Sequence, residues 1–476
     1  MSRKKDKEQP ILENIEILDA GSEGNCIAKQ DGMVIFVPYL VPGDRADLQI
    51  LKKKKNFAQA KAVRITKFSD KRTEKLCPHF TICGGCKWQE MLYSEQIKYK
   101  EKQVLDALQH IGGVSTSCAQ PILGSQKTKE YRNKLEFSFS SKRWITDQEV
   151  QSSEFIENNG GVGFHAPSSF CKVVDVTYCA LQEEPSNEIR NFVRDYTRTH
   201  SLSYYDTKTH EGLMRSMVCR TTQQGQIMLI VVFAYKSDEI EPLLNAIADK
   251  FPQITSLMYC INTKLNDSLG DQQMLLFKGQ EYIYEYMEAF DKDSESLKFK
   301  IGPKSFFQTN TLQAQRLYNE AAKLANLQKD ALVYDLYTGC GTIANYIAKS
   351  VKQVIGIEYI EEAITDAKEN SQVNNITNTV FYAGDMAKVF NNDFVKANGK
   401  PDIIITDPPR AGMAPLVIEQ LLALEANQIV YISCNPATQA RDIKLLSEKY
   451  NITAIQPVDM FPHTQHVENI ISLTKK

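Results

Sequence analysis

The 476-residue sequence lacks any apolar run long enough to cross a membrane. Its longest such run, IMLIVVFAY at 227–235, falls far short of the roughly 20 residues that a transmembrane helix needs. The opening MSRKKDKEQP is charged and no apolar stretch follows it, so we expect no secretion signal. The sequence therefore predicts a cytoplasmic protein with no membrane partner.

A strong net charge and internal repeats are also missing. The formal net charge is −2, and the content of 24% charged and 42% hydrophobic residues is typical of a globular protein. The chain is too long for one ordinary core, so we expect about two to four domains. No obligate protein partner is indicated, and we expect a monomer.

The cysteine content excludes a secreted disulfide scaffold. The eleven cysteines are odd in number, clustered, and not accompanied by a secretion signal. This pattern favours metal binding or catalysis in a reducing compartment. In CPHFTICGGCKWQ, the spacing of Cys77, Cys83 and Cys86 is too close for chance. Thiolates at such spacing suit an iron–sulfur cluster or zinc.

The N-terminal region predicts a small β-barrel. Residues 11–68 alternate short β-like runs with turns that contain Gly, Pro and Asp. Barrels of this kind bind oligonucleotides on one face. Lysines 52–55 and further basic residues up to position 75 form a stripe that suits phosphates. The alternative is a solvated strand edge, where lysines oppose aggregation.

The rest of the chain divides into two parts. Capping and periodicity predict a helix at 94–111, and residues 131–300 are rich in strands with some helices. The last third alternates short strands and helices, as in a doubly wound sheet. Its expected strands span 332–337, 353–358, 379–383, 402–406, 428–433, 453–460 and 469–473.

A glycine turn follows the first of these strands, in DLYTGCGT. Gly339 and Gly341 allow the backbone to approach a ligand closely at a helix N-terminus. Glu358 and Asp385 end the next two strands, where carboxylates can bind a ribose and an adenine. The third glycine of a dinucleotide fingerprint is absent, so S-adenosylmethionine fits at least as well as NAD. The alternative is that these acids cap the helices that follow them.

One cysteine and one glutamate lie near the ends of later strands. Carbon 5 of uracil becomes nucleophilic only when a thiolate adds to carbon 6, and a base must then remove the carbon 5 proton. Cys434, in YISCNPATQARD, fits the thiolate, and Glu468 fits the base. The target base must leave its helix to be reached. A non-catalytic RNA-binding factor on the same fold is expected to have lost this pair.

A second chemistry is disfavoured by TDPPR at 406–410. Enzymes that methylate exocyclic amines often carry an aromatic residue after Asp-Pro-Pro or Asn-Pro-Pro, and Arg410 stands there instead. A nitrogen methyltransferase has no need of a nucleophilic cysteine either.

Together, DLYTGCGT, TDPPRAG, ISCNPAT, HVENI and FFQTN resemble the RNA uracil-5-methyltransferase family, and the likeness covers nearly the whole chain. It implies a multidomain protein: a TRAM-like RNA-binding barrel at 1–75, a central α+β domain at 76–300, and an α/β Rossmann-like class I methyltransferase domain at 301–476. Residues 95–126 are expected to pack with the catalytic domain. The resemblance implies that Cys434 is the nucleophile, that Glu468 is the base, and that S-adenosylmethionine is bound by Gln308, Tyr337, Thr342, Glu358, Asp385 and Asp407.

The resemblance also implies a 4Fe–4S cluster in the central domain. Its fourth ligand follows a Val-Asp-Val run in the family, which indicates Cys179 in VVDVTYCALQ, with Cys171 as the alternative. Zinc is the alternative metal. The cluster favours 23S ribosomal RNA as substrate, because tRNA-specific relatives tend to lack both the cluster and the barrel; tRNA is the alternative. Cys340 is interpreted as a packing residue.

Overall fold

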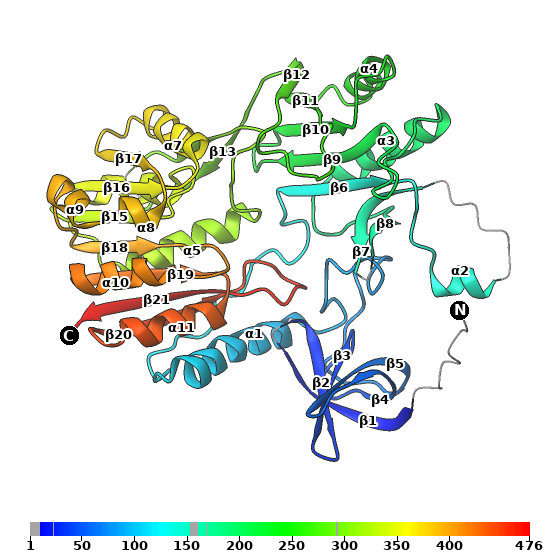
Figure 1. Ribbon diagram of the computed structural model, residues 1–476, viewed down its shortest axis with the longest axis horizontal. Helices are drawn as coiled ribbons and strands as arrows, with labels where there is room; N and C mark the ends of the chain where they lie inside the picture. The colour runs from blue at the N-terminus through cyan, green and yellow to red at the C-terminus, as the bar shows by residue number, and fades with distance from the viewer. Residues whose placement is uncertain (1–9, 22, 153–159, 168, 292–293) are drawn as a thin grey trace.

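The computed structural model describes residues 10–21, 23–152, 160–167, 169–291 and 294–476. The first nine residues of the expected N-terminal domain therefore lie outside the described residues. A closed barrel and two seven-stranded sheets follow one another along the chain (Figure 1). No helix within the described ranges is long and apolar enough to span a bilayer.

The N-terminal sheet closes into the predicted small barrel, with strand order β1-β2-β3-β5-β4. Along β4, buried and half-buried residues alternate, which gives the period of two expected of a barrel wall. Lysines 52–55 are exposed around the turn between the last two strands. The strands are β1 (Ile11–Ala20), β2 (Asn25–Gln30), β3 (Met33–Pro38), β4 (Arg45–Lys53) and β5 (Phe57–Lys67).

The central sheet has the order β12-β11-β10-β9-β6-β7-β8. Its middle strands, β9 and β10, are buried along nearly their whole length, because both faces of the sheet are covered. One face packs against α3 and α4, and the other faces the β13–β14 hairpin and α5. The strands are β6 (Lys134–Ser140), β7 (Gly161–Ala166), β8 (Ser169–Asp175), β9 (Met214–Thr221), β10 (Ile227–Phe233), β11 (Ser256–Ile261) and β12 (Met274–Gly279). The adjoining elements are α2 (Asp147–Gln151), α3 (Ser186–Thr199), α4 (Ile240–Lys250), β13 (Ile283–Met287) and β14 (Leu297–Ile301).

The C-terminal sheet has the order β17-β16-β15-β18-β19-β21-β20 and is parallel except for β21, which runs against both of its neighbours. It confirms the predicted Rossmann-like fold. The strands are β15 (Leu332–Leu336), β16 (Gln353–Glu358), β17 (Thr379–Ala383), β18 (Ile403–Thr406), β19 (Gln428–Ser433), β20 (Tyr450–Val458) and β21 (Glu468–Lys475). The helices are α5 (Thr311–Leu324), α6 (Thr342–Ile347) with a short 3-10 turn (Ala348–Ser350), α7 (Glu361–Val373), α8 (Met386–Val389), α9 (Asn392–Asn398), α10 (Pro415–Leu424) and α11 (Pro436–Leu446).

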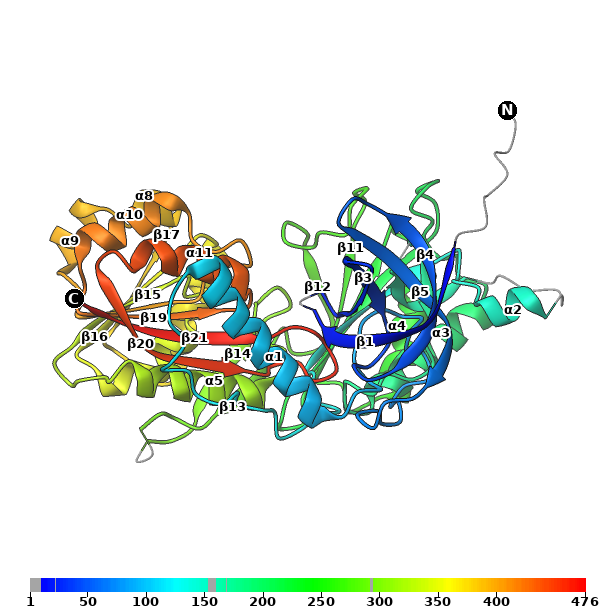
Figure 2. The same ribbon diagram turned by 90° about the horizontal axis from the view of Figure 1, so that it is seen from below.

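A helix from the N-terminal half lies against this C-terminal sheet. Helix α1 (Tyr93–Ala107) continues into a π-helical turn (Leu108–Gly112), and Val104 and Leu108 are fully buried in the same core as Tyr431. The segment that follows runs beside β20 through single bridges such as Ala119 to Ile455. Figure 2 shows α1 crossing between the barrel and the C-terminal sheet. This side of the C-terminal sheet is therefore built from two distant parts of the chain.

Candidate active site

Cys434 directly follows β19, and Glu468 is the first residue of the neighbouring strand β21. The antiparallel register of β19 and β21 pairs Ser433 with Asn469. Continuing this register by one residue pairs Cys434 with Glu468. Residues directly opposite each other in antiparallel strands have Cβ atoms about 4.5–5.5 Å apart. The strand pairing therefore brings together the two side chains on which the expected chemistry depends.

The turn after Cys434 fixes the place of its thiol. The Asn435 side chain accepts a hydrogen bond from the amide of Ala437 at 3.1 Å and caps α11, with Pro436 as the first helical residue. Its Nδ2 also donates to the carbonyl of Arg410 at 3.0 Å. This bond ties the Cys434 turn to the loop that ends β18. Cys434 is left half-buried at the carboxyl edge of the sheet.

Carboxyl groups crowd this edge and shift one another's pKa. Glu468 is only 5% exposed, and desolvation, with Asp407 adding to it, raises its pKa to about 8 while Arg410 opposes the rise. Desolvation and the nearby Asp335 raise the pKa of Asp407 to about 7. Groups that titrate close to neutral pH can exchange protons with a substrate. The site is suited to acid–base chemistry.

The Cys434 thiol is protonated in the resting state. Desolvation, Glu468 and Asp407 raise its pKa to about 11, and Arg410 acts in the opposite direction. A thiol in this setting becomes a nucleophile only when its proton is removed as the substrate binds.

A cavity of about 680 Å³ opens onto the thiol. One wall consists of residues near the carboxyl edge of the sheet, including Arg410, Cys434 and His466. The other walls come from Asp19 and its neighbours in the barrel and from Lys102 on α1. Residues 95–126 were expected to pack with the catalytic domain, but the barrel was not expected beside Cys434, because no local pattern reports a contact between segments so far apart.

The expected cofactor end of the sheet is assembled around the glycine turn. Gly339 and Gly341 have φ of 56° and 73°, in the left-handed region that favours glycine. The amide of Gly339 donates to a carboxylate oxygen of Glu358 at 3.1 Å. Thr342 begins α6 and is buried. The structure thus brings the turn and the carboxylate that ends β16 together.

The other expected cofactor residues are also placed. Asp385 caps α8 by accepting from the amide of Ala387 at 3.1 Å, so the helix-capping role considered for this acid is present. Tyr337 has φ of 64° and directly follows β15, before the glycine turn. The Gln308 carbonyl accepts from Asn133 Nδ2 at 2.9 Å.

Tyr318 was missed by the sequence analysis. This buried tyrosine on α5 has a pKa well above its usual value through desolvation and through its proximity to Asp407 and Cys340. It sits on a helix of ordinary amphipathic pattern, so no sequence signal distinguishes it from a packing residue.

A second cavity, of about 200 Å³, is lined by Cys77, Cys83, Cys86 and Cys179. Cys171 lies elsewhere, with its sulfur 3.4 Å from Ser169 Oγ on β8. Within the described ranges, no group of three or more His, Cys, Asp or Glu side chains is close enough to hold one metal ion. The four thiols surround a space instead of meeting at a point. Desolvation raises the pKa of Cys83 to about 11 and that of Cys86 to about 12.

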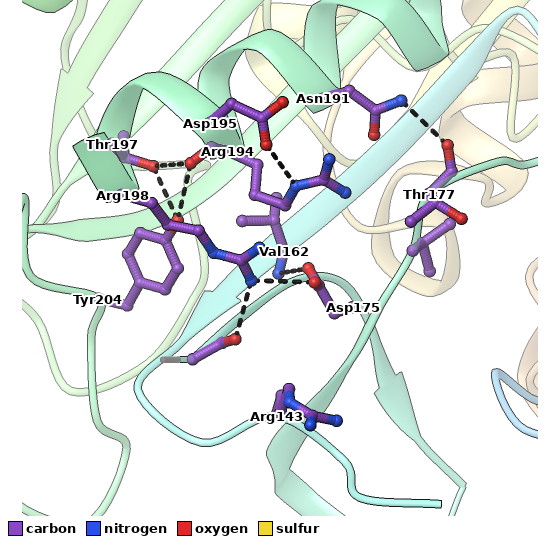
Figure 3. A network of polar contacts seen from close by, with 12 residues as sticks. Arg143, Val162, Asp175, Thr177, Asn191, Arg194, Asp195, Thr197, Arg198 and Tyr204 are labelled. Carbon is purple, nitrogen blue, oxygen red and sulfur yellow. Dashed lines mark hydrogen bonds and ion pairs between the residues drawn. The ribbon is translucent and has the colours of Figure 1, made fainter. Parts of the chain in front are cut away.

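A polar network holds the segment that leads to Cys179 against α3 (Figure 3). Asp175 accepts from Arg198 Nη2 at 2.9 Å and from the amide of Val162 at 3.0 Å. Two residues further on, the carbonyl of Thr177 accepts from Asn191 Nδ2 at 3.0 Å. These contacts fix the approach of the chain to the cavity.

Arg190, also on α3, is a fully buried cation beside these thiols. Its Nε donates to the carbonyl of Val176 at 2.8 Å and its Nη1 to Asn187 Oδ1 at 2.9 Å, both neutral acceptors. Asn187 Oδ1 also accepts from the amide of Cys179 at 2.7 Å. Burial lowers the pKa of Arg190 to about 10, although the nearby Cys179, Glu184 and Asp175 oppose the fall, so a further anion beside it would be stabilised. The residues present therefore fit an anionic group held by four thiolates.

Known proteins resemble this chain in sequence and in fold. A family model described as tRNA (uracil-5-)-methyltransferase matches residues 268–476, and a TRAM domain model matches residues 13–63. An uncharacterized RNA methyltransferase of Bacteroides thetaiotaomicron is 51% identical over 456 residues, which cover 95% of this chain and 99% of the relative. The chain belongs to the RNA uracil-5-methyltransferase family. This confirms the predicted family and enzyme class.

Two further matches extend along almost the whole methyltransferase. An uncharacterized RNA methyltransferase of Porphyromonas gingivalis is 52% identical over 470 residues, which cover 97% of this chain and 99% of the relative. The solved structure of Pyrococcus abyssi tRNA (uracil-54, C5)-methyltransferase in complex with S-adenosyl-L-homocysteine is 27% identical, with a TM-score of 0.72 and coverage of 96% of this chain and 99% of that one. These matches support S-adenosylmethionine as the cofactor.

Proposed function

We propose that this methyltransferase methylates carbon 5 of a uridine in RNA through a covalent adduct with Cys434. The observation that carries the proposal is the register of β19 and β21, which pairs Ser433 with Asn469 and so supports Cys434 and Glu468 as neighbours. The two side chains share one edge with Asp407 and Arg410, which act on the pKa of both. A nitrogen methyltransferase has no use for such a thiol and base.

In the proposed reaction, the Cys434 thiol first loses its proton to solvent. The resulting thiolate bonds to carbon 6 of the uracil, and the electron pair of the 5,6 double bond moves to an enolate. S-adenosylmethionine supplies the methyl group to carbon 5. The Glu468 carboxylate then accepts the carbon 5 proton, the double bond re-forms, and the carbon–sulfur bond breaks to release Cys434. Arg410 stabilises the negative charge that these steps create near both groups.

For the cofactor, we propose contacts at the glycine turn and along the strand ends. The carboxylate of Glu358 already accepts from the amide of Gly339, so it stands at the turn where the cofactor is expected. The proposed contact residues are Gln308, Tyr337, Thr342, Glu358, Asp385 and Asp407.

We also propose that Cys77, Cys83, Cys86 and Cys179 hold a 4Fe–4S cluster. A cavity of about 200 Å³ among the four thiols suits a group of several atoms better than one zinc ion. The buried guanidinium of Arg190 supplies the positive charge that such an anionic group requires. On this proposal the central domain spans 76–300, between the TRAM domain at 1–75 and the catalytic domain at 301–476.

The proposed substrate is 23S ribosomal RNA, on the strength of the cysteine set and the barrel. A tRNA is the second candidate, because the solved relative that matches nearly the whole chain is a tRNA (uracil-54, C5)-methyltransferase. In both cases the target base must leave the stacked RNA helix and enter the cavity that opens onto Cys434.

The test uses both RNAs, transcribed with 5-fluorouridine and incubated with the enzyme and S-adenosylmethionine. Fluorine cannot leave as a cation, so the reaction stalls as a covalent adduct that survives denaturation. We expect an adduct with 23S ribosomal RNA and none with tRNA. If only tRNA forms an adduct, tRNA and not 23S ribosomal RNA is the substrate. If neither RNA forms an adduct, the proposed carbon 5 chemistry is wrong.

A further inference from the structure

The loop between β20 and β21, residues 459–467, leads directly into Glu468 and is held by groups from outside the C-terminal sheet. It extends from that sheet toward the barrel and the central sheet (Figures 1 and 2). On α1, Lys100 Nζ lies 2.6 Å from Asp459 Oδ1, and both side chains are fully buried. Tyr93 Oη donates to Asp459 Oδ2 at 2.8 Å. The loop is thus anchored on α1 at its first residue.

The segment that follows the first three cysteines holds the loop at its centre. The amides of Lys87 and Trp88, directly after Cys86, both donate to the carbonyl of His463, at 2.9 and 3.0 Å. Trp88 is itself fixed, because it is buried in the barrel core and its Nε1 donates to the carbonyl of Gly24 at 3.3 Å. The loop therefore rests on a rigid part of the N-terminal half.

One buried side chain, Gln96 on α1, joins these segments. Its Oε1 accepts from the amide of His463 at 2.8 Å. Its Nε2 donates to the carbonyls of Trp88 and Met91, at 3.0 and 2.8 Å, and lies 3.2 Å from His463 Nδ1. His463 is thereby held at both its amide and its carbonyl.

This clamp accounts for an unusual backbone conformation. His463 has φ of 67°, which a residue with a side chain adopts only where its surroundings compel it. The chain enters β21 at Glu468 five residues later, so the direction of entry depends on the conformation at His463. Cys434 stands on a different turn, the one capped by Asn435. This turn meets the loop through Arg410, whose carbonyl accepts from Asn435 Nδ2 at 3.0 Å and whose Nη2 lies 3.5 Å from His466 Nδ1.

We propose that Gln96 is a positioning residue for the base of the reaction. It keeps His463 in the left-handed conformation and ties the β20–β21 loop to the segment that follows Cys86, so that Glu468 points at the carbon 5 proton. This inference rests on the proposed role of Glu468. A displacement of about 1 Å in a reacting group costs on the order of 100-fold in rate. Loss of Gln96 should therefore slow the removal of the carbon 5 proton by Glu468, but not the addition of Cys434 to carbon 6.

The test separates these two steps in Gln96→Leu. The rate of adduct formation with 5-fluorouridine RNA and S-adenosylmethionine reports the addition of Cys434 and the methyl transfer. Turnover on ordinary RNA of the same sequence also requires proton removal. We expect the rate of adduct formation in Gln96→Leu to stay within about twofold of that of the unmodified enzyme. Turnover on ordinary RNA should be lower by roughly 10- to 100-fold. Lys98→Ala, an exposed change on the same helix, should alter neither rate.

A purely structural role for Gln96 predicts a different result: both rates fall by one factor, the fraction of folded protein. That result, or unchanged turnover, overturns the inference. Glu468→Gln measured in parallel keeps the two proposals apart. If Glu468→Gln turns over normally, the base role itself fails. If it stalls while Gln96→Leu turns over normally, only the positioning role fails.

A second variant and a second readout guard against misfolding. Tyr93→Phe removes only the hydroxyl that donates to Asp459, and we expect the same selective loss of turnover at a smaller scale. Hydrogen exchange of Gln96→Leu should be faster at the amides of Lys87, Trp88 and His463, with bound iron unchanged. Unaltered exchange at these three amides contradicts the clamp.

Discussion

Around Cys434 the buried charged groups are carboxyls, whereas around Cys179 they are guanidiniums. Asp335, Asp407 and Glu468 crowd the carboxyl edge of the sheet, and their pKa values rise toward neutrality because each is desolvated and each lies near another acid. Arg190 and Arg132 instead act on the Cys179 thiol. Carboxyls that titrate near pH 7 can move protons, whereas guanidiniums keep their charge and stabilise a bound anion. Under the proposed function, the same polypeptide builds one cavity for proton transfer and one for an anionic group.

The largest expected effect is at the catalytic edge. In Cys434→Ala no sulfur remains to activate the ring, so we expect methyl transfer to fall by on the order of 10⁴-fold or more. Transfer of labelled methyl from S-adenosylmethionine to RNA measures it. Cys118→Ala, a half-buried cysteine outside both cavities, serves as control. Activity of Cys434→Ala within about tenfold of the unmodified enzyme would remove the thiol from the reaction.

The cysteine cavity is tested by a matched pair of cysteines. We expect Cys179→Ala to lose most of the bound iron and sulfide, because one of the four thiolates around the cavity is gone. Cys171→Ala should keep both, since its sulfur lies beside Ser169. Metal and sulfide analysis of protein purified without oxygen gives the result. Iron loss in Cys171→Ala with retention in Cys179→Ala reverses the assignment.

The raised pKa of Glu468 predicts how turnover depends on pH. Only the ionised carboxylate accepts a proton, and with a pKa of about 8 its ionised fraction falls tenfold per pH unit below that value. Turnover limited by proton removal should therefore rise with pH and level off above about 8. Steady-state rates at saturating RNA and cofactor, from about pH 6 to 9, test this. A flat profile means that Glu468 is ionised throughout or is not the base.

The smallest expected effect is on the melting temperature of an Arg190 variant. Its sign depends on whether the cysteine cavity holds an anionic group. Without an anion in the cavity, Arg190→Met removes a costly buried charge, and we expect the melting temperature to rise by a few degrees. With iron and sulfide bound, the same change removes their countercharge, and we expect a lower melting temperature and faster loss of iron. Arg194→Met, on the same helix and already paired with Asp195, is the control. Shifts of the same sign in both states contradict the charge assignment.

Much of the catalytic edge follows from local sequence. Short apolar runs bounded by turn residues predicted the strands of the last domain, and β16, β17 and β19 have the predicted ends. The carboxyl ends of parallel strands meet at one edge, so the place of Glu358 and Cys434 followed from the strand order. The Asn435-Pro436 pair likewise indicated the start of α11, where Asn435 is the cap.

The contacts between distant segments were beyond such reasoning. The thiol of Cys77 contacts the carbonyl of Tyr178, 101 positions away, and no periodic pattern encodes that contact. The same holds for Gln96, which meets His463 across 367 positions. Tertiary packing decides these pairs, and a buried glutamine in a helix looks in sequence like any solvated one. Local sequence patterns therefore locate the proposed reacting groups, but they do not predict the distant contacts that orient those groups.

The central claim is that Cys434 attacks the base and Glu468 removes the proton. Its most direct test is denaturing electrophoresis and mass spectrometry of Glu468→Gln after incubation with ordinary substrate RNA and S-adenosylmethionine labelled in the methyl group. The account predicts a stable protein–RNA band that carries the label, because methylated carbon 5 keeps its proton and Cys434 cannot leave. The band should be absent for the double variant that carries both Glu468→Gln and Cys434→Ala. Normal turnover by Glu468→Gln, or a band without label, would contradict the account.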